Sequence, residues 1–405
     1  MVGYRLSLDG VILRCSVCGA AYEPDPWLFF CPRCGGVFDV VLEEPRVTRG
    51  FRGRGVWRYS ELIPVKTQPV TMNEGGTPLI PVPRLAEESG VGAELYVKYE
   101  GANPTGSFKD RGMTVAVSLA RALGVRRAAA ASTGNTAASA AAYTARAGIG
   151  LTLVLPAGKV AKGKLGQSIL HGARILEVEG GFDEALSVVV ESVKRYGYYP
   201  LNSFNAWRLE GQKTIAFEVY EEIGVPDYVI VPVGNGGNIS AIWKGFKELL
   251  EAGLIDKLPR MIGVQAAGAA PLADAFLQGL DHPLFKDHPE TRATAIRIGK
   301  PINWAKAMRA VRESGGVFVK VSDEEIMKAQ RMLARLEGIG AEPAGAAGAA
   351  ALARLAAQGL LEKGERAVIV VTGHALKDPE AMMEAPTETL HAGSVEEAVK
   401  LLGLH

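Results

Sequence analysis

The sequence predicts an α/β protein of two doubly wound domains with a small appendage. Apolar, β-branched segments alternate with segments of helical periodicity along most of the chain, a pattern typical of parallel sheets covered by helices on both faces. The chain has 405 residues, which is too long for a single hydrophobic core. Its 48 glycines and aromatic content of 7% fit a tightly packed protein with many short turns.

The four cysteines all lie in the first 34 residues and form two Cys-x-x-Cys pairs, each followed by a glycine: Cys15, Cys18, Cys31 and Cys34. Such turns point backbone amides at thiolates, and four thiolates suit tetrahedral zinc. Disulfides are one alternative, but they fit poorly with a cytoplasmic chain. A redox pair, the other alternative, needs only one such motif. We therefore expect residues 1–45 to form a zinc-ribbon-like knuckle with a structural metal.

The alternating elements follow a linker at 47–57 and a turn-rich loop at 74–81 that precedes an edge strand. The first series has predicted strands at 95–99, 128–132, 151–155, 174–178 and 199–201, and helices at 107–123, 135–147, 160–171 and 182–196. The second series has strands at 228–233, 261–265 and 367–371, and helices at 238–252 and 341–357.

The charge balance and the hydropathy pattern exclude several classes of partner. Lysine and arginine total 45 against 44 aspartates and glutamates, so nothing indicates nucleic acid or an anionic membrane surface. No apolar stretch is long enough to span a membrane, and residues 1–14 carry charges where a signal peptide is apolar. We therefore expect a soluble cytoplasmic protein with no nucleic-acid or membrane partner.

Lys109 lies just inside the start of the predicted helix 107–123. A turn at 104–106 precedes it, and Ser107 with Asp110 forms a Ser-x-x-Asp capping pattern. The positive end of the helix dipole disfavours an ammonium group, which lowers the lysine pKa and favours the neutral amine that imine chemistry needs. The alternative is an ordinary solvated surface lysine.

Three turns lie where a predicted strand gives way to a helix or loop, the place where ligands bind in open α/β sheets. Residues 132–136 gather hydroxyls and amides at a helix start, which indicates either an anion site or an ordinary N-cap. Residues 234–238 form a glycine loop that could close around a phosphate. It lacks the glycine at Ile239 of a dinucleotide fingerprint and the lysine of a P-loop. The third turn, residues 370–374, closes a run of β-branched residues and contains Thr372.

The segment 202–214 offers a further candidate site, because it combines several amides with Arg208. A guanidinium is a bidentate partner for phosphate, so this set suits a phosphorylated substrate. The alternative is a surface loop with a structural Arg–Glu pair. Three lysines nearby in the chain are interpreted as a solvated face: Lys159, Lys162 and Lys164.

The run Asn-Pro-Thr-Gly-Ser-Phe-Lys-Asp-Arg-Gly-Met at 103–113 resembles the Schiff-base lysine motif of the threonine synthase family. These are pyridoxal-phosphate (PLP) enzymes of fold type II, the tryptophan-synthase-β-like fold. The resemblance extends from about Gly75 to Pro379 and includes the blocks 265–271 and 293–299. Two positions depart from the family pattern: Gly236 replaces a usual alanine, and Ala375 follows His374 where glycine is more common.

The resemblance implies two α/β domains with PLP in the cleft between them. The large domain would comprise 46–120 and 204–405, and the small domain 121–203. Lys109 would be the catalytic residue. The implied cofactor contacts are Lys109 as the imine partner, Asn135 at the ring oxygen, Gly234, Asn235, Gly236, Gly237 and Asn238 at the phosphate, and Thr372 at the pyridine nitrogen. The implied substrate contacts are Ser132, Thr133 and Thr136 at the carboxylate, and Asn202, Ser203 and Arg208 at the phosphate.

The implied reaction converts O-phospho-L-homoserine and water to L-threonine and phosphate by γ-elimination and β-addition. Other enzymes of the same fold are the rivals, namely cysteate synthase acting on phosphoserine and sulfite, or threonine dehydratase. A rival of another class is a zinc-ribbon module that binds a protein partner. We expect a homodimer.

Overall fold

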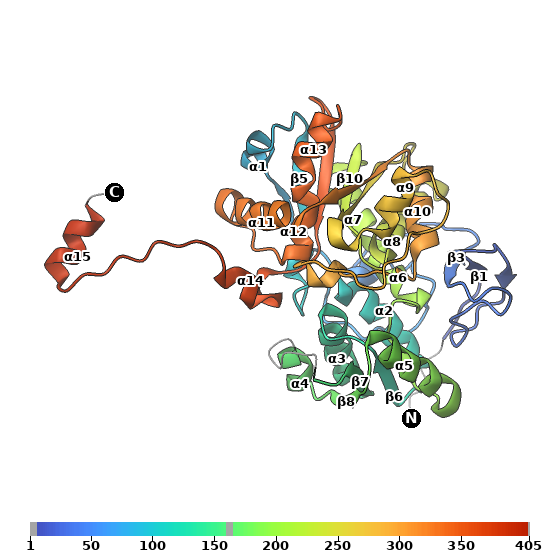
Figure 1. The fold of residues 1–405 in the computed structure, drawn as a ribbon. Coiled ribbons are helices and arrows are strands. Elements are labelled where there is room, and N and C mark those ends of the chain that lie inside the picture. The colour runs from blue at the N-terminus through green and yellow to red at the C-terminus, as the bar shows by residue number, and fades with distance from the viewer. Residues whose placement is uncertain (1–5, 159–164, 404–405) are drawn as a thin grey trace.

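The computed structural model describes residues 6–158 and 165–403, in which the strands form three sheets. The N-terminal sheet is antiparallel, in the order β2-β1-β3: β1 Val11–Cys15, β2 Ala21–Tyr22 and β3 Phe38–Leu42. It lies at one side of the molecule, beside α6 Leu209–Gln212 and α10 Trp304–Glu313 (Figure 1). It belongs to the segment predicted as the zinc-ribbon-like knuckle.

A four-stranded parallel sheet follows, in the order β8-β7-β6-β9: β6 Arg127–Ala130, β7 Gly150–Pro156, β8 Arg174–Val178 and β9 Tyr199–Pro200. Its helices are α3 Asn135–Ala147, α4 Gly166–Leu170 and α5 Phe182–Tyr196. Helix α2, Lys109–Ala122, packs against α3 on one side and α6 on the other. This helix therefore lies between the two larger layers of the fold.

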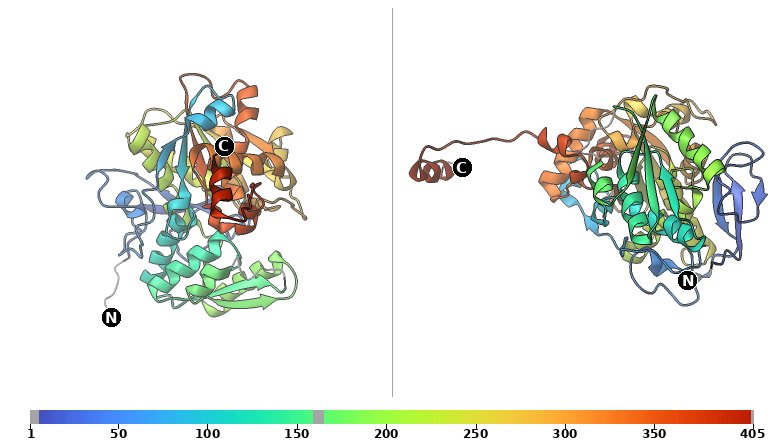
Figure 2. Two further views of the ribbon diagram at one scale, coloured as in Figure 1. Left: turned by 90° about the vertical axis from the view of Figure 1, so that its left-hand side faces the viewer. Right: turned by 90° about the horizontal axis from the view of Figure 1, so that it is seen from below.

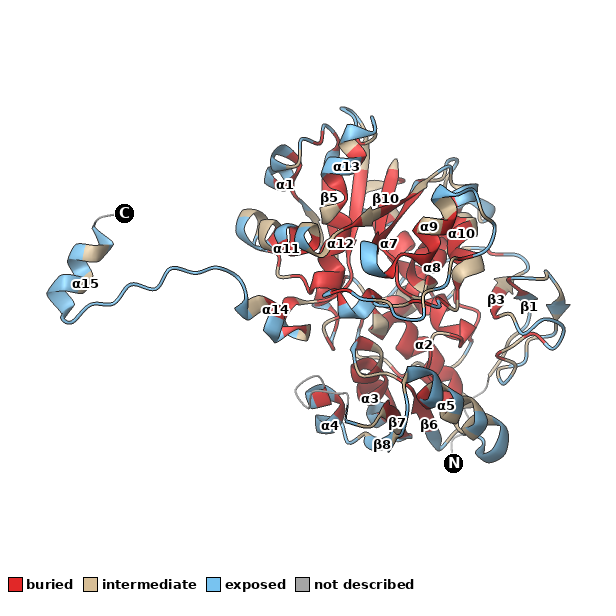
Figure 3. Ribbon diagram, in the orientation of Figure 1, coloured by how far each residue is buried: buried red, intermediate tan, exposed pale blue. Residues whose placement is uncertain are grey.

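The third sheet has six strands in the order β12-β11-β10-β13-β5-β4, all parallel except the edge strand β4. The strands are β4 Leu79–Pro81, β5 Glu94–Tyr99, β10 Tyr228–Pro232, β11 Arg260–Ala266, β12 Val317–Val321 and β13 Arg366–Val371. One face is covered by α1 Pro83–Glu88, α11 Asp323–Glu337, α12 Pro343–Ala350 and α13 Leu352–Ala357. The other face is covered by α7 Thr214–Ile223, α8 Gly237–Glu251, α9 Pro271–Leu277 and α10 Trp304–Glu313. Both faces of the central strands are buried, as Figure 3 shows, which explains their continuous apolar sequences.

Shorter elements connect these layers. The 3₁₀ turns are η1 Val56–Tyr59, η2 Glu100–Ala102, η4 Ala206–Arg208, η5 Ala267–Ala269, η6 Thr294–Ile296 and η7 Ala375–Lys377, and a single helical turn, α6 Leu209–Gln212, follows η4. After α14 Pro379–Met383, the chain extends away from the body and ends in α15 Val395–Leu402, none of whose residues is buried (Figure 2). No helix within the described ranges is long and apolar enough to cross a membrane.

The structure confirms the predicted α/β class and most of the predicted elements. The helices 135–147 and 182–196 and the strand 174–178 have the predicted bounds. The predicted helix 341–357 is instead two helices that meet at Ala351. Strand β12 and helix α11 were not predicted. Part of the predicted helix 160–171, together with Lys159, Lys162 and Lys164, lies outside the described residues.

The start of the helix that carries Lys109 also differs in detail. The helix begins at Lys109 rather than at residue 107, and Ser107 is not its N-cap. The Asp110 carboxylate turns back to accept hydrogen bonds from the backbone N–H and hydroxyl of Thr105, at 2.7 and 2.6 Å, and from the Ser139 hydroxyl at 2.6 Å. These bonds tie the turn before the helix to α3, which explains why the predicted local cap is absent.

Candidate active site

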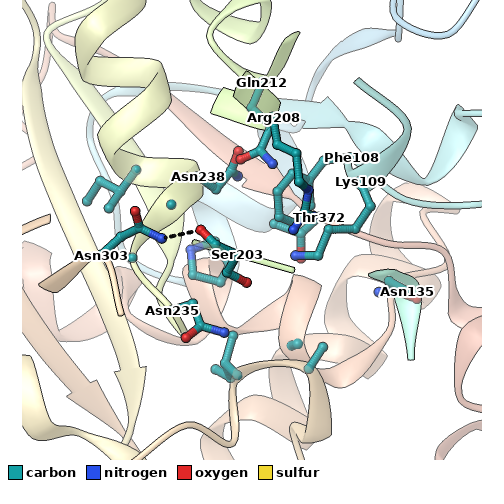
Figure 4. Close-up of a pocket in the computed structure, with 18 of the residues that line it drawn as sticks. Phe108, Lys109, Asn135, Ser203, Arg208, Gln212, Asn235, Asn238, Asn303 and Thr372 are labelled. Carbon is teal, nitrogen blue, oxygen red and sulfur yellow. Dashed lines mark hydrogen bonds between the residues drawn. The ribbon is translucent and has the colours of Figure 1, made fainter. Parts of the chain in front are cut away.

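A cavity lies at the carboxyl ends of strands from both parallel sheets (Figure 4). The start of α2, the start of α3, the β10–α8 loop and the residue after β13 all contribute to its walls. These segments are far apart in the sequence, and their strands are parallel, so their ends converge on one region. All eight residues predicted to contact PLP line this cavity: Lys109, Asn135, Gly234, Asn235, Gly236, Gly237, Asn238 and Thr372.

Lys109 is the first residue of α2, and its side chain extends into the cavity (Figure 4). Its Nζ lies 3.8 Å from the centroid of the Phe108 ring. The pKa of Lys109 is lowered to about 7, mainly by burial and also by the positive charge of Arg208, while the charge of Glu342 opposes both effects. The lowered pKa of Lys109 agrees with the expectation from the sequence, but its main cause is burial and not the helix terminus. A large fraction of this amine is therefore neutral near pH 7.

A buried ion-pair network holds the first turn of α2. Arg111 is fully buried and pairs with Glu100 at 2.6 Å and with Glu218 at 2.7 Å. Asp110 is also buried, and its burial raises the pKa of the carboxyl to about 6 despite its hydrogen bonds. Both neighbours of Lys109 in the sequence are thus anchored, and the helix start that presents the amine is rigidly placed.

The glycine loop between β10 and α8 presents backbone amides at the start of a long helix, which is an arrangement suited to a phosphate. Gly236 has a φ of 80°, in the left-handed region. A Cβ on Gly236 would lie 2.9 Å from the Cβ of Ala307 and 3.1 Å from the carbonyl oxygen of Asn303. Glycine is therefore the residue that this chain requires where the family usually has alanine.

Several buried polar atoms in and around the cavity lack a hydrogen-bond partner within the described protein. They are Oδ1 and Nδ2 of Asn238, Oε1 of Gln212, Oδ1 of Asn303 and Nε of Arg208. Unpaired buried polar groups are costly, and a polar ligand would satisfy them. With an amine at Lys109, a hydroxyl at Thr372 and an amide-rich helix start, the residues present fit PLP and a second anion.

Arg208 and Ser203 line the cavity, as predicted for residues that contact a substrate phosphate. The Arg208 side chain is buried, and burial lowers its pKa to about 10. No carboxylate among the described residues forms an ion pair with this guanidinium. A buried cation without a counter-charge is a site for an anionic ligand.

The other residues predicted to bind substrate do not line the cavity. The Asn202 amide is hydrogen-bonded at 3.0 Å to both the N–H and the carbonyl of Ala131, which joins the ends of β9 and β6. Ser132, Thr133 and Thr136 are partly exposed in the turn before and at the start of α3. Contact of these four residues with substrate stays a prediction.

Glu342 is a cavity residue that the sequence did not predict. It is buried, and its two carboxylate oxygens accept hydrogen bonds from Nδ2 of Asn135 at 2.9 and 3.0 Å. Burial raises the pKa of this carboxyl. Its only sequence signal is its position before Pro343, the first residue of α12. Asn205 and Gln212, two amides of the candidate segment 202–214, also line the cavity, as does Asn303, which the sequence did not single out.

The structure brings the four cysteine thiols together, as the spacing predicts. All four Sγ atoms lie within 4.8 Å of one another, and none is in a disulfide. Gly19 and Gly35 follow the two pairs with a φ of 73°, and their amides bond to the carbonyls of Cys15 and Cys31. This arrangement fits tetrahedral thiolate ligation of one metal ion.

His374 has a structural contact and does not line the cavity. Its Nδ1 accepts a hydrogen bond from the backbone N–H of Leu376 at 3.0 Å, which caps the turn η7. The histidine that continues the family motif after Thr372 is therefore accounted for by local structure.

Comparisons with known proteins give the family. The model of the family described as pyridoxal-phosphate dependent enzyme matches residues 70–373. A threonine synthase of Methanosarcina acetivorans is 49% identical over 383 residues, which cover 93% of this chain and 94% of the relative. A threonine synthase of Methanocaldococcus jannaschii is 50% identical over 391 residues, which cover 94% and 96%.

Solved structures are similar at the level of the fold. Maize serine racemase has a TM-score of 0.65 at 22% identity and covers 81% of this chain and 93% of its own. Threonine deaminase isoform 2 from Solanum lycopersicum has a TM-score of 0.65 at 23% identity and covers 76% and 86%. The expected fold is thus confirmed. The chain belongs to the family of pyridoxal-phosphate dependent enzymes, and within that family to the threonine synthases.

Proposed function

We propose that this protein converts O-phospho-L-homoserine and water to L-threonine and phosphate. Threonine synthases about half identical to it over nearly the whole chain support this function. The structural observation that carries it is the unpaired, buried guanidinium of Arg208 in the same cavity as Lys109. A lysine amine and a separate anion site in one cavity are what a PLP enzyme with a phosphorylated substrate needs.

The residues of the cavity take distinct parts in this proposal. PLP, when bound, supplies an electron sink that acidifies the carbons next to the substrate amine. Lys109 holds the cofactor and then moves protons at the α and β carbons, a task suited to an amine with a pKa near 7. Arg208 and Ser203 hold the phosphate that leaves from the γ carbon. The buried walls limit the access of water to these groups.

The other cavity residues contribute further contacts to the cofactor in this proposal. The amides of residues 234–238 hold the cofactor phosphate at the start of α8. The Thr372 hydroxyl would bond the pyridine nitrogen without forcing its protonation, which would moderate the electron sink. Asn135 would bond the ring oxygen, and the hydrogen bonds to Glu342 orient its amide.

A comparison of substrates tests the proposal against its rivals of the same fold. The purified protein with PLP is incubated in turn with O-phospho-L-homoserine, with O-phosphoserine plus sulfite, and with L-threonine. We expect threonine and phosphate from the first substrate. Cysteate from the second as the main product, or 2-oxobutanoate from the third, would assign the protein to cysteate synthase or threonine dehydratase instead.

We also propose a structural zinc ion at Cys15, Cys18, Cys31 and Cys34. The close approach of the four sulfurs supports it. Four protein ligands leave no open position for substrate, so this metal serves stability. Metal analysis of the purified protein, with a Cys18→Ser variant as control, tests the proposal. One equivalent of zinc is expected in the parent protein, and a metal-free parent protein would contradict it.

The domain division, assembly and location are further parts of the proposal. Strands β6 to β9 all fall within 121–203, which supports a small domain there and a large domain from 46–120 and 204–405. We propose a cytoplasmic homodimer, and the exposed apolar residues Val395, Val399 and Leu402 on the projecting α15 are consistent with contact to a second copy. Light scattering of the purified protein tests the dimer.

A further inference from the structure

The segment 203–208 lies between the cavity and the cysteine knuckle, and each of its side chains contacts one or the other. We call it the anion segment. Ser203 and Arg208 line the cavity, and Figure 4 shows both among its residues. Phe204 and Trp207 are fully buried but are not cavity residues. The packing partners of these two aromatic side chains therefore determine where the two polar side chains are held.

Phe204 packs against the loop that connects the two cysteine pairs. Its ring centroid lies 4.9 Å from that of Phe30 and 5.9 Å from that of Phe29. Phe29 and Trp27 also make edge contacts with Tyr199, the first residue of β9, at 5.8 and 5.4 Å. The loop between the cysteine pairs thus presents an aromatic surface to the strand and the segment that lead to Arg208.

Trp207 belongs to the apolar core of the knuckle itself. It shares one buried cluster with Cys15, Cys31, Phe38 and Val40. The turn η4, which contains Trp207 and Arg208, directly contacts β3. Two of the four proposed metal ligands are therefore packed in the same cluster as the residue next to the anion-binding arginine.

Polar contacts fasten the knuckle to the helices beneath it. Asp39 of β3 pairs with Lys306 at 3.2 Å and with Arg309 at 3.3 Å, both on α10. Arg309 also donates to the carbonyl oxygen of Ser16 at 2.6 Å, and Lys244 of α8 bonds to the carbonyl of Val40. The knuckle is thus fixed to the large sheet's helices and has a rigid base from which to hold the anion segment.

Asn303, which precedes α10, completes the connection to the cavity. Its side-chain amide donates to the carbonyl of Ser203 at 3.1 Å, and its backbone N–H donates to the carbonyl of Asn235 at 3.0 Å. One helix start therefore links the anion segment to the glycine loop. The anion segment is held from its outer side by the knuckle and from its inner side by α10.

We infer that the cysteine knuckle is a brace for the anion segment, with Phe204 and Trp207 as positioning residues that place Ser203 and Arg208. The state of the four-cysteine site then sets the affinity for the substrate phosphate, although the cysteines never touch the substrate. This inference rests on the proposed function for the identity of that anion. The N-terminal segment would then support the active site of its own chain and would not serve as a module that binds a protein partner.

Two matched variants test the brace. Phe30→Leu removes the ring that touches Phe204. The control, Phe276→Leu, removes a ring on α9 that is also partly buried and touches Phe318 on β12. With the PLP-loaded protein, we expect Phe30→Leu to raise KM for O-phospho-L-homoserine and the calorimetric Kd for inorganic phosphate about tenfold. Phe276→Leu should leave both unchanged. Equal values for the two variants would overturn the inference.

Hydrogen exchange supplies a readout that does not depend on the reaction. Phe30→Leu and Cys34→Ser should both speed amide exchange at 203–208, and Phe276→Leu should not. Cys34 is exposed and outside the Trp207 cluster, so an effect of Cys34→Ser on 203–208 must pass through the knuckle. Faster exchange confined to residues 6–42 would overturn the brace. If the parent protein neither makes threonine nor binds phosphate, the proposed function fails, while the exchange result still decides the brace.

Discussion

The side-chain amide of Asn135 donates hydrogen bonds to both carboxylate oxygens of Glu342, at 2.9 and 3.0 Å, across 207 positions of sequence. The pair joins the start of α3, from the four-stranded sheet, to the start of α12, from the six-stranded sheet. It also places a buried carboxyl close enough to Lys109 to raise the pKa of the lysine.

Glu342→Gln should lower the pKa of Lys109 below about 7, because the substitution removes the charge that opposes burial and Arg208. More of the amine is then neutral at mildly acidic pH. We expect the acidic limb of the pH profile for PLP uptake, measured with the cofactor-free protein, to shift to lower pH. Glu313→Gln, which loses an ion pair with Lys247 on the distant α10–α8 surface, is the matched control. A limb that stays in place in Glu342→Gln would contradict the prediction.

The stability of the cofactor-free protein should depend on the titration of Lys109. Its folded pKa is about 7, whereas an unfolded lysine titrates near pH 10.4. Between these values the unfolded chain binds more protons than the folded one, so the free energy of unfolding rises with pH by up to about 1.4 kcal/mol per unit. Lys109→Met lacks this dependence. In denaturant unfolding from pH 7 to 9, the free energy of unfolding of the parent protein should rise relative to that of the variant. A constant difference in free energy across this range would argue against a neutral amine at Lys109.

Gly236→Ala should destabilise the protein by about 1–2 kcal/mol, because φ is 80° and the new Cβ meets Ala307 at 2.9 Å. The affinity for PLP should fall as well, since the loop start shifts. Adding Ala307→Gly removes the contact but not the backbone strain, so we expect partial recovery. Thermal unfolding and PLP titration measure both effects. Full stability in the single variant would show that the loop accommodates the alanine that the family usually carries.

Arg208→Lys keeps a positive charge but loses the bidentate donor geometry. We expect KM for O-phospho-L-homoserine to rise roughly tenfold to a hundredfold, with a smaller change in kcat. The visible spectrum of bound PLP should persist, because Arg208 is assigned to the substrate. Arg146→Lys, at the exposed far end of α3, is the control. An unchanged KM would remove Arg208 from the phosphate site.

The sequence predicted those parts of the fold whose determinants are local. The helices 135–147 and 182–196 are each bounded by glycines, and Gly148 and Gly197 end them in the left-handed conformation. The break at Ala351 was missed because alanine favours helix on both sides, and Ala351 itself keeps right-handed helical backbone angles.

The candidate site shows the same limit. Lys109, the glycine loop and Thr372 could be found because each follows a strand or begins a helix within a recognisable motif. Glu342 and Asn303 could not, since their parts depend on contacts with Asn135 and Ser203 from distant segments. The predicted Ser107 cap failed for a similar reason, because Asp110 bonds instead with Thr105 and with Ser139 of another helix.

The most direct test of the account is threonine formation by the parent protein and by Lys109→Ala. Both are loaded with PLP and given O-phospho-L-homoserine, and threonine and phosphate are quantified. We expect equimolar products from the parent protein. The variant should retain bound PLP, lack the visible absorbance of lysine-linked cofactor, and lose turnover by a factor of roughly 10³ or more. Threonine formation at the parental rate by Lys109→Ala would contradict the central claim.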